Sequence, residues 1–183
     1  MILHHDFETR SAEDLLQVGL DNYTSSPTTR AILLSWAVDD APAQLWQPHL
    51  HGPEIPEEAR ELLLDPAVTK CAWNSAFERS VWRHVFKIES PASEWADPMI
   101  QARYLSLPGK LELAGPIAGL PLEKTKMREA RVLLHTFCQP IQKGANKGNF
   151  NDSHSHPEAW LRFCRYCVQD TEAERAFYRR FML

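Results

Sequence analysis

The segment Arg30 to Val38, RAILLSWAV, is the most restrictive feature of the sequence. Seven of its nine residues are apolar, and they lack the regular polar alternation of a strand with one face in water. Such a run is typical of an interior strand that is covered on both faces. Helices supply that cover in a layered α/β protein. At 183 residues and 44% hydrophobic, the chain is long enough to form one domain of this kind over residues 1–183.

The flanking segments supply the remaining elements. Turn residues at 39–42 predict a hairpin between the apolar run and a strand at 44–47. Further strands are expected at 1–7 and 68–73 and helices at 57–64, 75–86, 98–105, 111–119, 125–138 and from Pro157 onward, and a mobile loop is expected at 140–156. The prediction is an α/β fold in which helices flank a mixed central sheet that carries one antiparallel hairpin.

Charge is distributed unevenly along the chain. Residues 1–97 carry 7 Lys and Arg against 16 Asp and Glu, whereas residues 98–183 carry 13 against 8. The overall charge of −4 argues against a generally basic nucleic-acid-binding surface. An acidic half and a basic half nevertheless fit a protein that gathers carboxylates at one site and uses cations elsewhere on a polyanion. An ordinary solvated surface explains the same split.

Two carboxylates stand two residues apart where the first predicted strand ends. Because side chains alternate along a strand, Asp6 and Glu8 share one face and can reach one cation. Carboxylate oxygens are the ligands preferred by hard cations such as Mg²⁺ and Mn²⁺. Standing alone, the pair would also fit two charged residues at a frayed strand end.

Two further groups extend this pattern. Glu78 lies in the first turns of the helix that follows Asn74, a residue suited to an N-cap. Tyr166 and Asp170 are spaced i, i+4 and so share one face of the last helix. That face differs from the apolar stripe that contains Cys164 and Cys167.

Taken in order, Asp6-Phe-Glu8-Thr9, Asn74-Ser-Ala-Phe-Glu78 and Tyr166-Cys-Val-Gln-Asp170 resemble the three motifs of the DEDDy 3′–5′ exonucleases. More narrowly, the whole chain is similar to the proofreading domain of bacteriophage-type family A DNA polymerases. The segments DPMIQARYLSLPGKLELA and YCVQDTEAER carry part of that similarity.

The resemblance implies a ribonuclease H-like fold and a two-metal mechanism with Mg²⁺ or Mn²⁺. Asp6, Glu8 and Asp170 would hold one cation, and Asp6 with Glu78 would hold the other. Tyr166 would orient the attacking water. Two cations about 4 Å apart stabilise both the attacking and the leaving oxygen of a phosphodiester displacement.

The second motif departs from the family pattern, which usually ends in Asp. Glu78 is longer by one methylene, so its reach to a cation differs. Thr9 and Asn74 are candidates for contacting the terminal nucleotide, although Asn74 also fits the role of a helix cap alone.

Other chemistry-bearing residues admit a plainer interpretation. The Cys164-Arg-Tyr-Cys167 spacing with His154 and His156 upstream has a zinc-like composition, but on a helix the sulfurs would face the core. Six basic residues fit either phosphate contacts or plain surface charge, namely Lys124, Lys126, Lys143, Lys147, Arg162 and Arg165.

Three functions therefore remain open. The first is an exonuclease that releases nucleoside 5′-monophosphates from single-stranded or frayed DNA 3′ ends, and the second is a proofreading module that works beside a polymerase domain or subunit. The third is a nuclease-like binding module with a decayed site. An RNA substrate stays possible because nothing in the sequence reads the 2′-hydroxyl. The absence of a leader or an apolar span predicts a cytoplasmic protein in a bacterial or phage-infected cell, with no membrane partner.

Overall fold

The computed structural model describes residues 1–117, 119 and 126–182, with only the backbone for residues 126–128. Its centre is a five-stranded sheet in the order β3-β2-β1-β4-β5. The strands span Ile2–Arg10 (β1), Arg30–Val38 (β2), Gln44–Trp46 (β3), Thr69–Cys71 (β4) and Trp95–Ala96 (β5). β2 pairs antiparallel with both β1 and β3, whereas β4 pairs parallel with β1 and β5.

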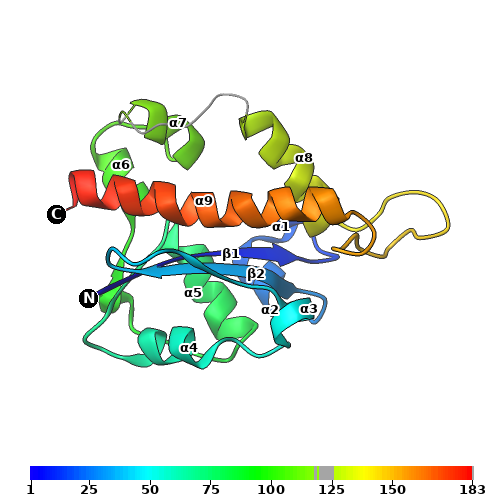
Figure 1. The fold of residues 1–183 in the computed structure, drawn as a ribbon, viewed down its shortest axis with the longest axis horizontal. Coiled ribbons are helices and arrows are strands. Elements are labelled where there is room, and N and C mark those ends of the chain that lie inside the picture. Colours follow the sequence, from blue (N-terminus) through cyan, green and yellow to red (C-terminus); the bar gives the residue numbers. More distant parts are fainter. Residues whose placement is uncertain (118, 120–125, 183) are drawn as a thin grey trace.

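Helices cover both faces of this sheet (Figure 1). The described helices are α1 (Leu15–Val18), α2 (Leu20–Ser25), α3 (Pro48–His51), α4 (Glu57–Leu64), α5 (Ser75–His84), the 3₁₀ turn η1 (Ala92–Glu94), α6 (Pro98–Tyr104), α7 (Leu111–Ile117), α8 (Lys126–Cys138) and α9 (Pro157–Phe181). The long helix α9 crosses one face, and α4 and α5 lie on the other. None of the helices in the described part of the chain combines the length and apolar character needed to cross a bilayer.

The core consists of two main clusters, one on each face of the sheet. Leu3 and Phe7 of β1 pack with Trp82 of α5 on one side. Leu33 of β2 packs with Phe163 of α9 on the other. Because β2 contributes to both clusters, its nearly continuous apolar sequence is accounted for by burial on both faces.

The predicted mixed sheet between two helical layers is confirmed. The strand at 30–38 and the helix at 57–64 have the predicted bounds, and the β2–β3 hairpin is present. The antiparallel part is larger than one hairpin, because β1 also pairs antiparallel with β2. The prediction that the first strand ends at residue 7 is wrong, since β1 continues to Arg10 on its pairing with β2.

The predicted helices at 111–119 and 125–138 fall partly on residues 118 and 120–125, outside the described part of the chain, as does Lys124. The structure assigns α7 and α8 on either side of that gap. Residues 140–156 form an irregular loop in which the backbone N–H of Ile141 donates to the carbonyl of Asn149 at 2.8 Å.

The unequal lengths of β1 and β4 shape the sheet near the predicted site. In their parallel pairing, Cys71 at the end of β4 lies opposite His4 of β1. β1 then continues for six residues without β4 beside it. The chain that leaves β4 turns into α5 instead, so space opens beside the second half of β1.

Candidate active site

The second half of β1 carries the first two candidate residues. Glu8 is 6% exposed and Asp6 is half-buried. Ligand atoms of these two residues and of Cys167 all lie within 4.8 Å of one another. The pairing of β1 with β2 shifts register between Glu8 and Thr9, an irregularity of the kind often found beside active sites.

The start of α5 is arranged differently from the expectation. Asn74 occupies the cap position with φ 67° and ψ 53°, and its side chain makes no capping hydrogen bond. The predicted side-chain cap is therefore wrong. The carboxylate of Asp97 accepts from the backbone N–H groups of Asn74 at 3.1 Å and Ser75 at 2.9 Å. A carboxylate from the end of β5 thus satisfies the helix terminus, and the Asn74 side chain is left exposed beside the site.

Glu78 lies one turn further along α5 and is 2% exposed. Its Oε2 atom is buried and has no hydrogen-bond partner within the described structure. Burying an unpaired carboxylate oxygen costs free energy, so native proteins rarely tolerate it without a ligand, ion or water. The Oε2 atom of Glu78 is therefore suited to accept a cation.

The last helix brings three polar residues to the site. Tyr166, Asp170 and Glu174 follow one another at intervals of four residues, so they share one face of α9. The Tyr166 hydroxyl donates a hydrogen bond to the Asp170 carboxylate. Because α9 packs on β1, this face lies against the strand that carries Asp6 and Glu8.

One cavity of about 470 Å³ collects these residues. Its lining includes all seven residues singled out from the sequence, which are Asp6, Glu8, Thr9, Asn74, Glu78, Tyr166 and Asp170. Trp73, Phe77, Lys110 and Glu174 also line it. The strand, the α5 terminus and the α9 face therefore meet at a single space of nucleotide size.

The carboxylates in this cavity disfavour one another's charged forms. Burial, and then the charge of Asp170, raises the pKa of Asp6 well above its ordinary value. Burial, and then the charge of Asp6, has the same effect on the pKa of both Glu8 and Glu78. Such a group is unstable without positive charge, which bound cations supply.

Two tyrosines border the carboxylates. Burial and the charge of Asp170 raise the pKa of Tyr166, so its hydroxyl stays protonated at neutral pH. Burial raises the pKa of Tyr23 to about 12, and its hydroxyl is 2.9 Å from Oγ1 of Thr9. Thr9 is therefore fixed by a neighbour that the sequence motifs do not include.

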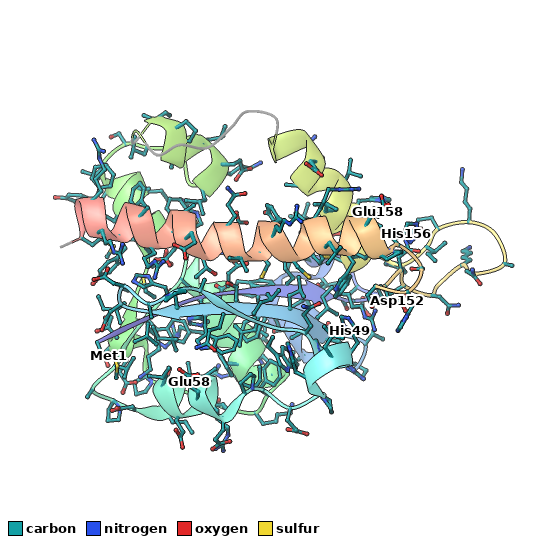
Figure 2. All side chains as sticks on the ribbon, in the orientation of Figure 1. Met1, His49, Glu58, Asp152, His156 and Glu158 are labelled. Carbon is teal, nitrogen blue, oxygen red and sulfur yellow. The ribbon has the colours of Figure 1, made fainter. Side chains whose placement is uncertain are left out.

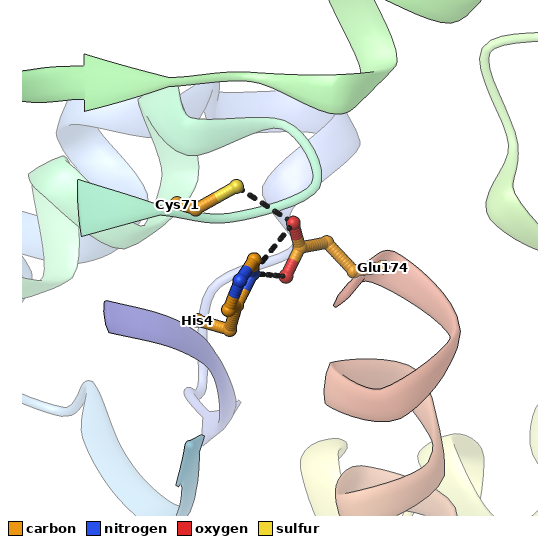
Figure 3. A group of neighbouring side chains, drawn as sticks. All are labelled: His4, Cys71 and Glu174. Carbon is orange, nitrogen blue, oxygen red and sulfur yellow. Dashed lines mark hydrogen bonds and ion pairs between the residues drawn. The ribbon is translucent and has the colours of Figure 1, made fainter. Parts of the chain in front are cut away.

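A second cluster was missed by the sequence analysis. The His4 ring nitrogen Nδ1 donates to Oε2 of Glu174 at 3.0 Å, and the Cys71 thiol donates to Oε1 at 2.7 Å (Figure 3). All three residues are buried. The four-residue spacing between Asp170 and Glu174 predicts that they share one face of α9. The hydrogen bonds from His4 and Cys71 could not be predicted in this way, because they depend on the pairing of β1 with β4.

The zinc interpretation of Cys164 and Cys167 gains no support. Within the described part of the chain, two groups have metal-ligand proximity: His4 with Cys71 and Glu174, and Asp6 with Glu8 and Cys167. Neither includes His154 or His156. His156 instead lies at the start of α9, where its backbone N–H donates to the carbonyl of Asp152 at 3.1 Å (Figure 2).

Of the basic residues considered for phosphate contacts, those with described side chains are not among the residues that line the cavity. Arg162 is paired with Glu129 at 2.9 Å, and Lys143 and Lys147 are exposed in the 140–156 loop. The side chain of Lys126 is outside the described structure.

A mixed sheet in this order, flanked by helices and carrying acidic residues on β1, has the predicted ribonuclease H-like fold. Over nearly its whole length the chain resembles one DNA polymerase in particular, that of Bacillus phage SP02, with 32% identity over 178 residues. The match covers 96% of this chain and 27% of the polymerase, so the chain spans about a quarter of that relative. The resemblance to phage-type polymerases predicted from the motifs is confirmed.

A solved nuclease structure shares the fold. The apo form of a nuclease superposes with a TM-score of 0.51 at 14% identity, covering 98% of this chain and 70% of that one. Brucella melitensis NrnC bound to pGG has a TM-score of 0.41 at 14% identity, covering 98% and 80%. No protein-family model matches the chain.

Proposed function

We propose that this chain is a divalent-metal-dependent 3′–5′ exonuclease that removes nucleoside 5′-monophosphates from single-stranded or frayed DNA ends. The observation that carries the proposal is the meeting of Asp6, Glu8, Glu78 and Asp170, from three separate elements, in one cavity. DNA is favoured over RNA because the relative that matches along nearly the whole chain is a DNA polymerase.

The donor set fits hard cations. All four residues offer carboxylate oxygens, and the buried Oε2 of Glu78 has no protein partner within the described structure. Asp6, Glu8 and Asp170 would hold one ion, and Asp6 with Glu78 the other. Bound Mg²⁺ or Mn²⁺ would stabilise negative charge on the attacking and leaving oxygens of the phosphodiester.

The remaining residues would position the reactants. The Tyr166 hydroxyl is kept protonated and directed by Asp170, so its oxygen can accept a hydrogen bond from the attacking water. Thr9 and the exposed Asn74 border the cavity and would contact the terminal nucleotide. Lys110, also in the lining, would attract the phosphate.

Degradation of end-labelled oligonucleotides tests this proposal. A 5′-labelled single-stranded DNA should shorten one nucleotide at a time in Mg²⁺ or Mn²⁺ and stay intact in EDTA. Asp6→Asn should remove the activity, whereas Glu61→Gln, an exposed change on α4 across the sheet, should not. An oligonucleotide that stays intact with every metal would contradict the proposal and favour a binding module. Faster loss of a matched RNA would reassign the substrate.

We also propose that the activity serves proofreading beside a polymerase domain or subunit. The similarity to part of a DNA polymerase supports this role. Digestion of a primer with a mismatched 3′ end, with and without an added candidate polymerase, measures the coupling. A rate and product length unaffected by the polymerase would favour a free-standing enzyme.

A further inference from the structure

The buried cluster of His4, Cys71 and Glu174 adjoins the carboxylates of the candidate site along β1 and α9. Glu174 is 2% exposed, and both of its oxygens are occupied, one by the imidazole and one by the thiol. A buried carboxylate with two donors is far less costly than an unpaired one. Each oxygen of the Glu174 carboxylate therefore has a hydrogen-bond donor within the cluster.

The three residues join three elements, β1, β4 and α9. His4 and Cys71 are direct partners in the β1–β4 pairing, and both side chains point to Glu174 on α9 (Figure 3). The ring of Tyr178, one turn beyond Glu174, packs edge-on against the His4 ring at 5.3 Å between centroids. The cluster thus fixes where α9 lies along β1.

Two of these elements, β1 and α9, also carry proposed metal-binding residues. His4 precedes Asp6 by two residues and shares its face of β1, and Glu174 follows Asp170 by one helical turn. Any shift of α9 relative to β1 at this point changes the separation of Asp6 and Asp170. Glu174 also lines the cavity, and its charge acts on Asp6 and Glu78.

We propose that Glu174, held by His4 and Cys71, is a positioning residue that fixes Asp170 against Asp6 and adds negative potential, and thereby sets the cation affinity of the site. This inference rests on the proposed function, because it assumes that the site binds cations. Mutation of a residue that orients metal ligands commonly lowers metal affinity about 10- to 100-fold.

Calorimetric titration of the whole chain with Mn²⁺ tests the inference without relying on activity. Glu174→Gln keeps the side-chain size and removes the charge, and it should weaken Mn²⁺ binding about tenfold. His4→Ala should weaken binding as well, and His4→Asn should restore much of it, because an Asn amide nitrogen can replace Nδ1 as donor. If Glu174→Gln does not fold, the two His4 variants decide the question.

Arg175→Met provides the matched control. Arg175 is the next residue on α9, is 6% exposed, and donates to the carbonyls of Asp39 and Ala41, away from the cavity lining. Its loss should lower the melting temperature while Mn²⁺ affinity stays within twofold of wild type. Equal weakening in Arg175→Met and Glu174→Gln would overturn the inference, because general loosening of α9 would then explain both.

Three further outcomes are decisive. Wild-type affinity in Glu174→Gln and in His4→Ala would overturn the positioning role while leaving the proposed function intact. If wild type itself binds no Mn²⁺, the proposed function fails, and this inference fails with it. A Cys71-dependent thiolate absorption band on addition of Co²⁺ would also overturn it, because the cluster would then bind metal directly.

Discussion

Glu174 and the carboxylates of the candidate site line the same cavity, and they tolerate burial in different ways. Both oxygens of Glu174 accept hydrogen bonds, one from the His4 imidazole and one from the Cys71 thiol. In the candidate site the carboxylates repel one another, and Glu78 has a buried oxygen with no hydrogen-bond partner among the described residues. Glu174 is therefore satisfied within the protein, whereas added positive charge would favour the ionised forms of the candidate-site carboxylates.

Removing one acid from the candidate site should have the largest effect. Asp170→Asn or Asp6→Asn should lower the exonuclease rate about a thousandfold, because charge stabilisation of the transition state depends on the complete set. Without metal, the same variants should melt at a higher temperature than wild type, since one repelling charge is gone. Nuclease assays and thermal melts in EDTA measure both effects. A loss of activity together with a lower melting temperature would indicate misfolding instead.

The Tyr166→Phe change should have the next largest effect on activity. Loss of the hydroxyl removes the group directed by Asp170 and should lower the rate about a hundredfold. Mn²⁺ affinity should stay close to wild type, because no carboxylate is lost. Parallel measurements of rate and calorimetric affinity check this separation, and an equal fall in both would assign Tyr166 to metal binding.

The length of Glu78 provides a finer test of the unpaired oxygen. Glu78→Asp withdraws that oxygen by about one carbon–carbon bond and should raise the Mg²⁺ concentration for half-maximal rate about tenfold. Glu78→Gln, which keeps the reach and removes the charge, should be at least as impaired. Full activity of Glu78→Asp at low Mg²⁺ would show that the distance to a cation is not critical at this position.

The smallest expected effect is a dependence of metal-free stability on pH. Because Asp6, Glu8 and Glu78 have folded pKa values above their unfolded ones, the folded state binds more protons than the unfolded state above pH about 4. Their contribution to stability therefore falls as pH rises from about 4 through the raised pKa values.

Thermal melts from pH 4 to 8 in EDTA measure this dependence. The slope should be shallower in Asp6→Asn than in wild type, and excess Mn²⁺ should raise the wild-type melting temperature most at the alkaline end, where the carboxylates are ionised. Parallel slopes in wild type and Asp6→Asn would argue against repulsion within this group.

The sequence predicts those parts of the molecule that follow from local periodicity. The apolar run of β2, the alternation that joins Asp6 to Glu8, and the helical spacing of Tyr166 and Asp170 are all local properties. The fold class followed from the order of these elements, and the structure brings the candidate residues to one cavity.

Features that depend on distant pairing could not be predicted in this way. Asp97 replaces Asn74 as the cap of α5 because β5 ends beside that helix, and this neighbour lies 23 residues away. Likewise, His4 meets Cys71 through the register of a parallel pairing, which no single segment specifies. Composition alone would place Glu174 on the surface, since a buried Glu is rare without a partner.

The early end of β4 at Cys71 has a consequence for how the protein could change. A loop insertion elsewhere would leave the candidate residues in place, but two more residues of β4 would run alongside Asp6 and narrow the cavity that these residues line. Access to the cavity thus depends on where β4 ends. Deletions and insertions between residues 71 and 74 should therefore be tolerated far less than those in the nearby loops.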